Sequence, residues 1–183
     1  MTKINSICVY CGSSIGNNPS YALAANILGR MIAKAGISLV YGGGTTGIMG
    51  TIARAVKSNG GKVFGIIPSF LINKEATGDH EKLFDEFIIT ETMHQRKQLM
   101  FDHSDGFLAF PGGIGTLEEI VEIMTWAQLG QHHKPVAFAN IDGFWNPMIA
   151  LLDHMKKQGF IHHDLNALVI DDVQKILEVF SVN

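Results

Sequence analysis

The sequence contains no apolar run that approaches the roughly 20 residues needed to cross a bilayer. Its N-terminal stretch, MTKINSICVYCGSS, also lacks the basic segment and long apolar run of a secretory signal. We therefore expect a cytoplasmic protein with no membrane association. The net charge is only −3, so the basic face of a general nucleic-acid binder is missing as well. A few local donors would still suffice to hold one small anion.

Cysteine is scarce, with only Cys8 and Cys11 in a C-x-x-C arrangement. One interpretation of this spacing is a thioredoxin-like redox pair. The surrounding residues INSICVYCG are typical of a strand, in which three steps of about 3.3 Å separate the two Cα atoms by about 10 Å. A disulfide requires less than about 7 Å. The two side chains would also point to opposite faces of the sheet, so we expect buried free thiols.

Motifs for metal binding and for a serine nucleophile are also missing. The chain has eight histidines, but it has no H-E-x-x-H motif and no Cys/His ligand spacing. The adjacent pairs His132–His133 and His162–His163 cannot direct both rings to one site, so surface or packing roles are expected. No G-x-S-x-G elbow occurs.

What the chain does contain is a regular alternation of short apolar runs and helical segments. With 183 residues, 46% of them hydrophobic, one globular domain covering residues 1–183 is expected. Strands that are apolar throughout are buried on both faces, as in parallel sheets. We therefore predict an α/β, Rossmann-like, doubly wound parallel sheet with helices on both faces. The predicted strands are 4–12, 37–44, 62–68, 86–90, 106–110, 135–140 and 167–170, and the predicted helices are 18–36, 47–61, 93–104, 116–130, 144–159 and 172–181.

In such folds, ligands bind at the carboxyl ends of the strands. Three turns follow predicted strands there: the turn that contains Ser13, the turn 41–47 and the turn 111–116. The segment 69–85 is longer than most loops and is a further candidate for function.

The turn 41–47 matches G-x-G-x-x-G through Gly42, Gly44 and Gly47. A dinucleotide site also expects an acid at the end of the next strand, but that strand ends in FGIIPS. The Walker pattern fails too, because no Gly-Lys-Ser/Thr follows. A single glycine turn between a strand and a helix usually only tightens the connection. Two such turns suggest a phosphorylated small molecule held by backbone N–H groups near helix N-termini. This interpretation places Ser13, Gly43, Gly44 and Gly112 at the ligand.

The charged residues near these turns allow two interpretations. Thr116 and Glu119 fit a capping box, with Thr116 as N-cap. In the segment TMHQRKQLM, Arg96 and Lys97 lie early in a predicted helix, where positive charge opposes the helix dipole. An acidic partner should compensate, either Glu119, Glu75 or a ligand.

Four segments taken together resemble the LONELY GUY family of cytokinin riboside 5′-monophosphate phosphoribohydrolases: YGGGTTGIMG, MHQRK, PGGIGTLEE and TWAQLGQHHKPVAFANIDGFWNPM. Some bacterial relatives of this family carry the labels AMP nucleosidase or possible lysine decarboxylase. The resemblance runs from about Ile4 to Ile161. Two positions depart from the family pattern: Gln95, where Glu is frequent, and Thr92, where Asp is frequent.

The resemblance implies that Arg96 and Glu119 form a catalytic pair and that the protein assembles as a homodimer, or as a larger assembly of dimers, with the site completed near the interface. It implies the following substrate-binding residues: Glu75, Lys97, Gly113, Ile114, Gly115, Thr116, Leu117, Glu118 and Thr125. The expected substrate is a nucleoside 5′-monophosphate, either an N6-modified adenosine monophosphate or AMP, which is hydrolysed to free base and ribose 5-phosphate.

We expect this reaction to need no metal and no redox cofactor, because a positioned carboxylate can stabilise the developing positive charge of the sugar. A competing hypothesis is a nucleotide-binding module without catalysis. A further alternative, lysine decarboxylase, needs pyridoxal phosphate on a lysine, and Lys97 is the only lysine in the first three of these segments.

Overall fold

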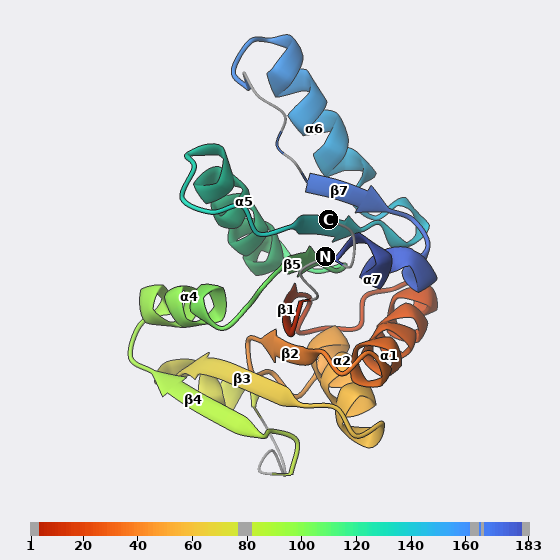
Figure 1. Ribbon diagram of the computed structural model, residues 1–183, viewed down its shortest axis with the longest axis vertical. Coiled ribbons are helices and arrows are strands. Elements are labelled where there is room, and N and C mark those ends of the chain that lie inside the picture. Colours follow the sequence, from red (N-terminus) through yellow and green to blue (C-terminus); the bar gives the residue numbers. More distant parts are fainter. Residues whose placement is uncertain (1–3, 77–81, 162–164, 166, 181–183) are drawn as a thin grey trace.

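The computed structural model describes residues 4–76, 82–161, 165 and 167–180. Seven parallel strands form one sheet in the order β4-β3-β2-β1-β5-β6-β7 (Figure 1). The strands are β1 (Ser6–Tyr10), β2 (Ser38–Tyr41), β3 (Val63–Pro68), β4 (Glu86–Thr90), β5 (Phe107–Ala109), β6 (Val136–Ala139) and β7 (Ala167–Ile170). The α-helices are α1 (Pro19–Lys34), α2 (Gly47–Ser58), α3 (Ile72–Glu75), α4 (Met93–Asp102), α5 (Ile114–Gln128), α6 (Asn146–Lys157) and α7 (Ile176–Val179).

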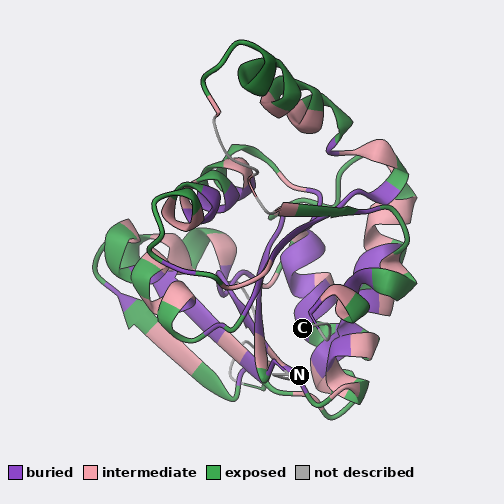
Figure 2. Cartoon of the chain, turned by 45° about the horizontal axis from the view of Figure 1, so that its top comes forward, coloured by how far each residue is buried: buried purple, intermediate pink, exposed green. Residues whose placement is uncertain are grey.

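Helices cover both faces of this sheet, as predicted. One core packs α1, α2 and α7 against the sheet, and a second core packs α4 and α5 against the other face. Figure 2 shows the central strands as the buried centre between these layers, whereas the edge strands β4 and β7 are partly exposed. No helix within the described ranges is long and apolar enough to cross a membrane.

Strand β1 shows how the sequence divides the two cores. Ile7 and Val9 face the α1 side, whereas Cys8 and Tyr10 face the α5 side. Cys11, just beyond the strand, belongs to the α1 side, so the two thiols lie on opposite faces. Both are free and buried, which confirms the prediction for the C-x-x-C pair.

The start of α5 differs from the prediction. The helix begins at Ile114 and its N-cap is Gly113, which has no side chain to accept a hydrogen bond. Thr116 is therefore the third helical residue, and the capping box predicted for Thr116 and Glu119 is wrong. The glycines of PGGIG already adopt the geometry that starts the helix, so no threonine cap is needed.

A capping box does occur at the start of α4. The Thr92 side chain accepts a hydrogen bond from the N–H of Gln95, and the Gln95 side chain accepts one from the N–H of Thr92. The two positions that depart from the family pattern thus satisfy each other and fix the first turn of the helix that carries Arg96.

Two other predicted segments differ in detail. The predicted helix 172–181 is a 3₁₀ turn, Val173–Lys175, followed by the single turn of α7. The segment 69–85 contains a second 3₁₀ turn, Ser69–Leu71, and then α3. Residues 77–81 of that segment and the pair His162–His163 lie outside the described residues.

The strand order reverses between β1 and β5. The chain places β2, β3 and β4 on one side of β1 and β5, β6 and β7 on the other. A crevice forms at the carboxyl ends of the two central strands of such a sheet, where the following loops diverge. The sheet thus brings the turn after β1 next to the turn after β5.

Candidate active site

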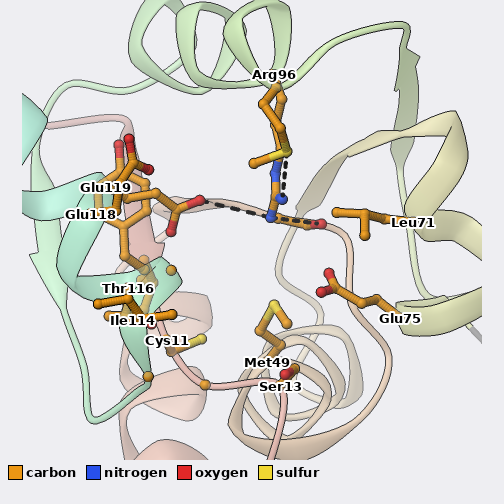
Figure 3. Close-up of a pocket in the computed structure, with 17 residues that line it drawn as sticks. Cys11, Ser13, Met49, Leu71, Glu75, Arg96, Ile114, Thr116, Glu118 and Glu119 are labelled. Carbon is orange, nitrogen blue, oxygen red and sulfur yellow. Dashed lines mark hydrogen bonds and ion pairs between the residues drawn. The ribbon is translucent and has the colours of Figure 1, made fainter.

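A cavity of about 370 Å³ lies at this point. Its size falls within the range of small-molecule sites. Its walls come from the ends of β1 and β5, the turn after β2, the segment around α3, and the first turns of α4 and α5 (Figure 3). The lining residues are Val9, Tyr10, Cys11, Gly12, Ser13, Gly42, Met49, Leu71, Glu75, Met93, Arg96, Gly113, Ile114, Gly115, Thr116, Glu118 and Glu119.

Arg96 and Glu119 face each other across the cavity, although one belongs to α4 and the other to α5. The Nη2 atom of Arg96 lies 3.8 Å from Oε1 of Glu119, and both side chains are about nine-tenths buried. This distance is an ion pair but is too long for a hydrogen bond. Both groups therefore retain hydrogen-bonding capacity toward a bound molecule.

The protonation of Glu119 is set mainly by burial. Loss of solvent raises the pKa of Glu119 to about 7, the charge of Arg96 opposes this, and the nearby carboxylates of Glu118 and Glu75 reinforce it. A carboxyl group that titrates near neutral pH is suited to proton transfer or to charge stabilisation during a reaction.

Gly42 makes room for the guanidinium group of Arg96. The Nη2 atom donates to the Gly42 carbonyl oxygen at 3.4 Å, and a Cβ atom at residue 42 would clash with that same nitrogen. Glycine at this position is therefore a steric requirement of the arginine. Gly43 and Gly44 were predicted as ligand contacts but Gly42 was not, because its contact with α4 cannot be foreseen from local spacing.

The N-terminus of α5 opens into the cavity. The first N–H groups of a helix have no partner within it and favour anions. Gly113 and Gly115 have open space where a side chain would be, so a ligand could approach the backbone closely. The side chain of Thr116 packs against Gly112, where any Cβ atom would clash with its hydroxyl oxygen. These contacts support the predicted anion site at Gly113–Thr116.

The N-terminus of α2 is already occupied by backbone partners. The N–H groups of Ile48 and Met49 donate to the carbonyl oxygens of Ser14 and Gly12, at 3.3 and 3.1 Å. Gly43 and Gly44 do not line the cavity. Among the described residues, the structure thus brings one of the two predicted glycine turns to the cavity with free N–H groups, while the other fastens the turn after β1.

Four further predicted residues are not among those that line the cavity: Lys97, Leu117, Thr125 and Gly112. The Lys97 ammonium contacts the carboxylates of Glu118 and Glu122 at 2.7 and 3.0 Å. This cation therefore joins α4 to α5, and Glu118 is partnered rather than simply solvated. The Thr125 hydroxyl donates to the carbonyl oxygen of Val121 at 2.8 Å.

Two buried polar atoms at the cavity have no hydrogen-bond partner among the described residues: Oε2 of Glu75 and Nε of Arg96. Buried polar groups are almost always paired, so such atoms in a cavity wall indicate a ligand position. Several wall residues were not predicted, namely Tyr10, Met49, Leu71 and Met93. Their apolar character resembles that of core residues, and only the fold brings them to the site. The described residues contain no group of three or more His, Cys, Asp or Glu side chains that could hold a metal ion.

Fold and site together define a Rossmann-like α/β protein with a site for an anionic small molecule beside a buried Arg–Glu pair. Comparison with known proteins makes this specific. A family model described as "Possible lysine decarboxylase" matches residues 49–180. The chain is 43% identical to the cytokinin riboside 5′-monophosphate phosphoribohydrolase LOG4 of Arabidopsis thaliana over 185 residues, which is 98% of this chain and 85% of that protein. It is 44% identical to the LOG enzyme of Oryza sativa subsp. japonica over 92% of this chain and 69% of that protein.

Among solved structures, the molybdenum cofactor carrier protein of Chlamydomonas reinhardtii matches with a TM-score of 0.71 and 22% identity, covering 96% of this chain and 95% of that one. The molybdenum cofactor binding protein of Rippkaea orientalis matches with a TM-score of 0.69 and 22% identity, covering 99% and 98% of the two chains. These likenesses confirm the predicted fold and say nothing further. The chain belongs to the LONELY GUY family of phosphoribohydrolases, as its motifs predicted.

Proposed function

We propose that this protein hydrolyses the N-glycosidic bond of a nucleoside 5′-monophosphate, releasing the free base and ribose 5-phosphate. The substrate is a cytokinin riboside 5′-monophosphate, the substrate class in the names of the relatives, or AMP. The observation that carries the proposal is the position of the buried Arg96–Glu119 pair beside the open N-terminus of α5. An anion site and a tuned carboxyl group are the two elements that this reaction requires.

The phosphate binds at the N-terminus of α5, where the N–H groups of Ile114, Gly115 and Thr116 can donate to its oxygens. This interaction orients the sugar and places the anomeric carbon near Glu119. The bond then breaks through an oxocarbenium-like sugar, and the carboxylate of Glu119 stabilises its positive charge and directs a water molecule to the carbon. Orientation through the phosphate explains why a nucleoside without it should react poorly.

Arg96 positions both partners. Its Nη2 atom is held by Gly42 and Glu119, while its buried Nε atom has no partner in the part of the chain that the structure describes and can donate to the phosphoribosyl group. A planar guanidinium presents several fixed donors, so one side can hold Glu119 while another meets the substrate.

The two alternatives receive less support. A module that only binds a phosphate would gain nothing from Glu119 and Glu75, which repel an anion. A decarboxylase of the pyridoxal phosphate type would require Lys97 in the cavity, but its ammonium pairs with Glu118 and Glu122 beside it.

We also propose that the protein forms a homodimer. Helix α6, at the top of Figure 1, has no buried residue among those described. Large apolar side chains are exposed on α5, α6, β7 and nearby: Val121, Leu129, Leu151, Met155, Phe160, Leu168 and Val169. Such a surface is suited to an interface with a second copy. The cytoplasmic location stays a prediction from the sequence.

The test is incubation of the purified protein with AMP and with isopentenyladenosine monophosphate, followed by assay of free base and ribose 5-phosphate. Glu119→Gln should bind the nucleotide but turn over at least about 100-fold more slowly, because it cannot carry the charge. Glu86→Gln, on the exposed start of β4, is the matched control and should behave as the wild type. Wild-type turnover by Glu119→Gln would overturn the mechanism, and bound nucleotide without any product would favour the binding module.

A further inference from the structure

Glu75 presents a buried acceptor to the cavity. Its Oε2 atom is shielded from solvent and has no hydrogen-bond partner among the described residues. The backbone there is well fixed, because the Glu75 carbonyl oxygen accepts hydrogen bonds from the N–H of Thr45 at 2.8 Å and from its hydroxyl at 3.3 Å. The main chain that carries this side chain is therefore anchored, while the buried Oε2 atom has no partner among the described residues, which costs the free protein stability.

The position of Glu75 indicates which part of the substrate it meets. In Figure 3, Glu75 lies on the opposite side of the cavity from Ile114 and Thr116, and the Arg96–Glu119 pair lies between the two sides. If the phosphate binds at α5 and the anomeric carbon lies near Glu119, the base extends toward Glu75. This step rests on the proposed function.

The wall on this side of the cavity is apolar. Leu71 lies beside Glu75, and Met49 lies between Glu75 and Cys11 in the view of Figure 3. A flexible methionine side chain and a leucine can pack against the faces of a flat aromatic ring. Such a wall favours a base rather than a sugar, whose hydroxyl groups would remain unpaired against it.

We propose that Glu75 determines base specificity by accepting a hydrogen bond from an exocyclic N–H group of the base. The substrate class is then nucleoside 5′-monophosphates whose base carries an amino group with at least one hydrogen, including 6-aminopurines with a single N6 substituent. A base with an oxo group in that place presents an acceptor to an acceptor, and a doubly substituted amine has no hydrogen to donate. A site built to pair with a donor rejects ligands that lack it, because its own buried group is left unpaired.

The experiment compares four substrates: AMP, N6-methyl-AMP, N6,N6-dimethyl-AMP and inosine monophosphate. We expect the wild type to use the first two with similar kcat/KM and the last two at least about 10-fold less well. In Glu75→Gln the amide can donate as well as accept, so the ratio of AMP to inosine monophosphate should fall to within about threefold. Glu86→Gln, an exposed carboxylate changed in the same way, should keep the wild-type ratios.

Two further measurements keep the proposal distinct from its alternatives. If Glu75 holds the ribose instead, Glu75→Gln will leave the base ratios unchanged and will alter only the discrimination against 2′-deoxy- and 3′-deoxy-AMP, which overturns the proposal. If no nucleotide is hydrolysed, the proposed function fails, but calorimetric binding of AMP and N6,N6-dimethyl-AMP to the wild type and to Glu75→Gln still decides the role of Glu75. Equal affinity of the wild type for these two nucleotides overturns it, and thermal unfolding verifies that the variant folds.

Discussion

The Nη2 atom of Arg96 lies 3.4 Å from the carbonyl oxygen of Gly42, where any Cβ atom would clash with it. Gly42 directly follows β2, whereas Arg96 belongs to α4, which comes after β3 and β4 in the sequence. The guanidinium group of Arg96 thus contacts the carbonyl oxygen of Gly42 and the carboxylate of Glu119. Glycine at residue 42 is therefore required by the arginine side chain, whether or not a ligand contacts this turn.

Gly42→Ala should abolish most activity while leaving the fold intact. The added methyl group meets the end of a flexible side chain, so Arg96 moves rather than the backbone. We expect kcat to fall at least about 100-fold, as for loss of a charge-stabilising donor, with a small change in melting temperature. The measurements are steady-state kinetics and thermal unfolding. The comparison variant is Gly113→Ala, at a position with open space around it, which tests the anion site. Gly60→Ala is unsuitable as a control because Gly60 has a positive φ. Full activity in Gly42→Ala would contradict the steric role.

Arg96→Gln should shift the pH profile. Burial raises the pKa of Glu119 to about 7 and the charge of Arg96 opposes the rise, so removing that charge raises the pKa further. Because the reaction uses the carboxylate, kcat/KM of the wild type should increase with pH up to about 7, and the variant should require a higher pH. The measurement is kcat/KM between pH 5 and 10, with Arg96→Lys as the variant that keeps the charge. An unchanged acid limb in Arg96→Gln would show that another group titrates.

Glu119→Gln should stabilise the fold at neutral and alkaline pH. The folded-state pKa, about 7, exceeds the usual value of 4.5, so the folded state binds more protons between these values. Wild-type stability therefore falls as pH rises through this window, and glutamine avoids the loss. The gain should be on the order of 3 kcal/mol above pH 7 and should vanish near pH 4. Urea unfolding at both pH values measures it, and a gain independent of pH would contradict the assignment.

Lys97→Met separates two roles. If Lys97 holds α4 against α5 through Glu118 and Glu122, its loss should lower kcat several-fold and move the acid limb to higher pH, because the charge of Lys97 opposes the rise in the pKa of Glu119. If Lys97 contacts the phosphate, as the family pattern implies, KM for the nucleotide should rise at least about 10-fold instead. Kinetics over a range of pH decide between the two.

Leu151→Asp, on the exposed face of α6, should weaken the proposed homodimer. Leu151 is 46% exposed in the single chain, so its replacement should not disturb the core. Light scattering after size exclusion should show a dimer for the wild type and a shift toward monomer for the variant. Asp153→Asn on the same helix is the control. A wild-type monomer at micromolar concentration would remove the basis of the proposal.

Much of this architecture could be predicted from local patterns. Apolar runs bounded by glycines predicted the strands. The absence of alternating polar residues in these runs predicted burial on both faces and therefore a parallel sheet. The N-cap of α5 was placed three residues too late, at Thr116 instead of Gly113, because the T-x-x-E spacing matches a capping box whereas a glycine N-cap has no side chain that reveals it.

The residues of the candidate site were likewise only partly predictable from the sequence. The need to offset a positive charge early in a helix left Glu119, Glu75 and a ligand open as partners of Arg96, and only the resemblance to the family selected Glu119. Gly42, Tyr10 and Met93 could not be recognised, because each looks like an ordinary turn or core residue until the strand order brings it to the cavity. The occupied N–H groups at α2 likewise depend on a long-range contact with the turn after β1.

The reversal of strand order between β1 and β5 also has a kinetic meaning. Cys8 pairs with Phe107, so the two central strands come from distant parts of the chain. Contacts between distant segments are slow to form during folding, since a long loop must close first. The cavity does not exist until that closure is complete. The return of enzymatic turnover after dilution from denaturant would therefore time the closure itself, and would lag behind any signal that reports helix formation alone.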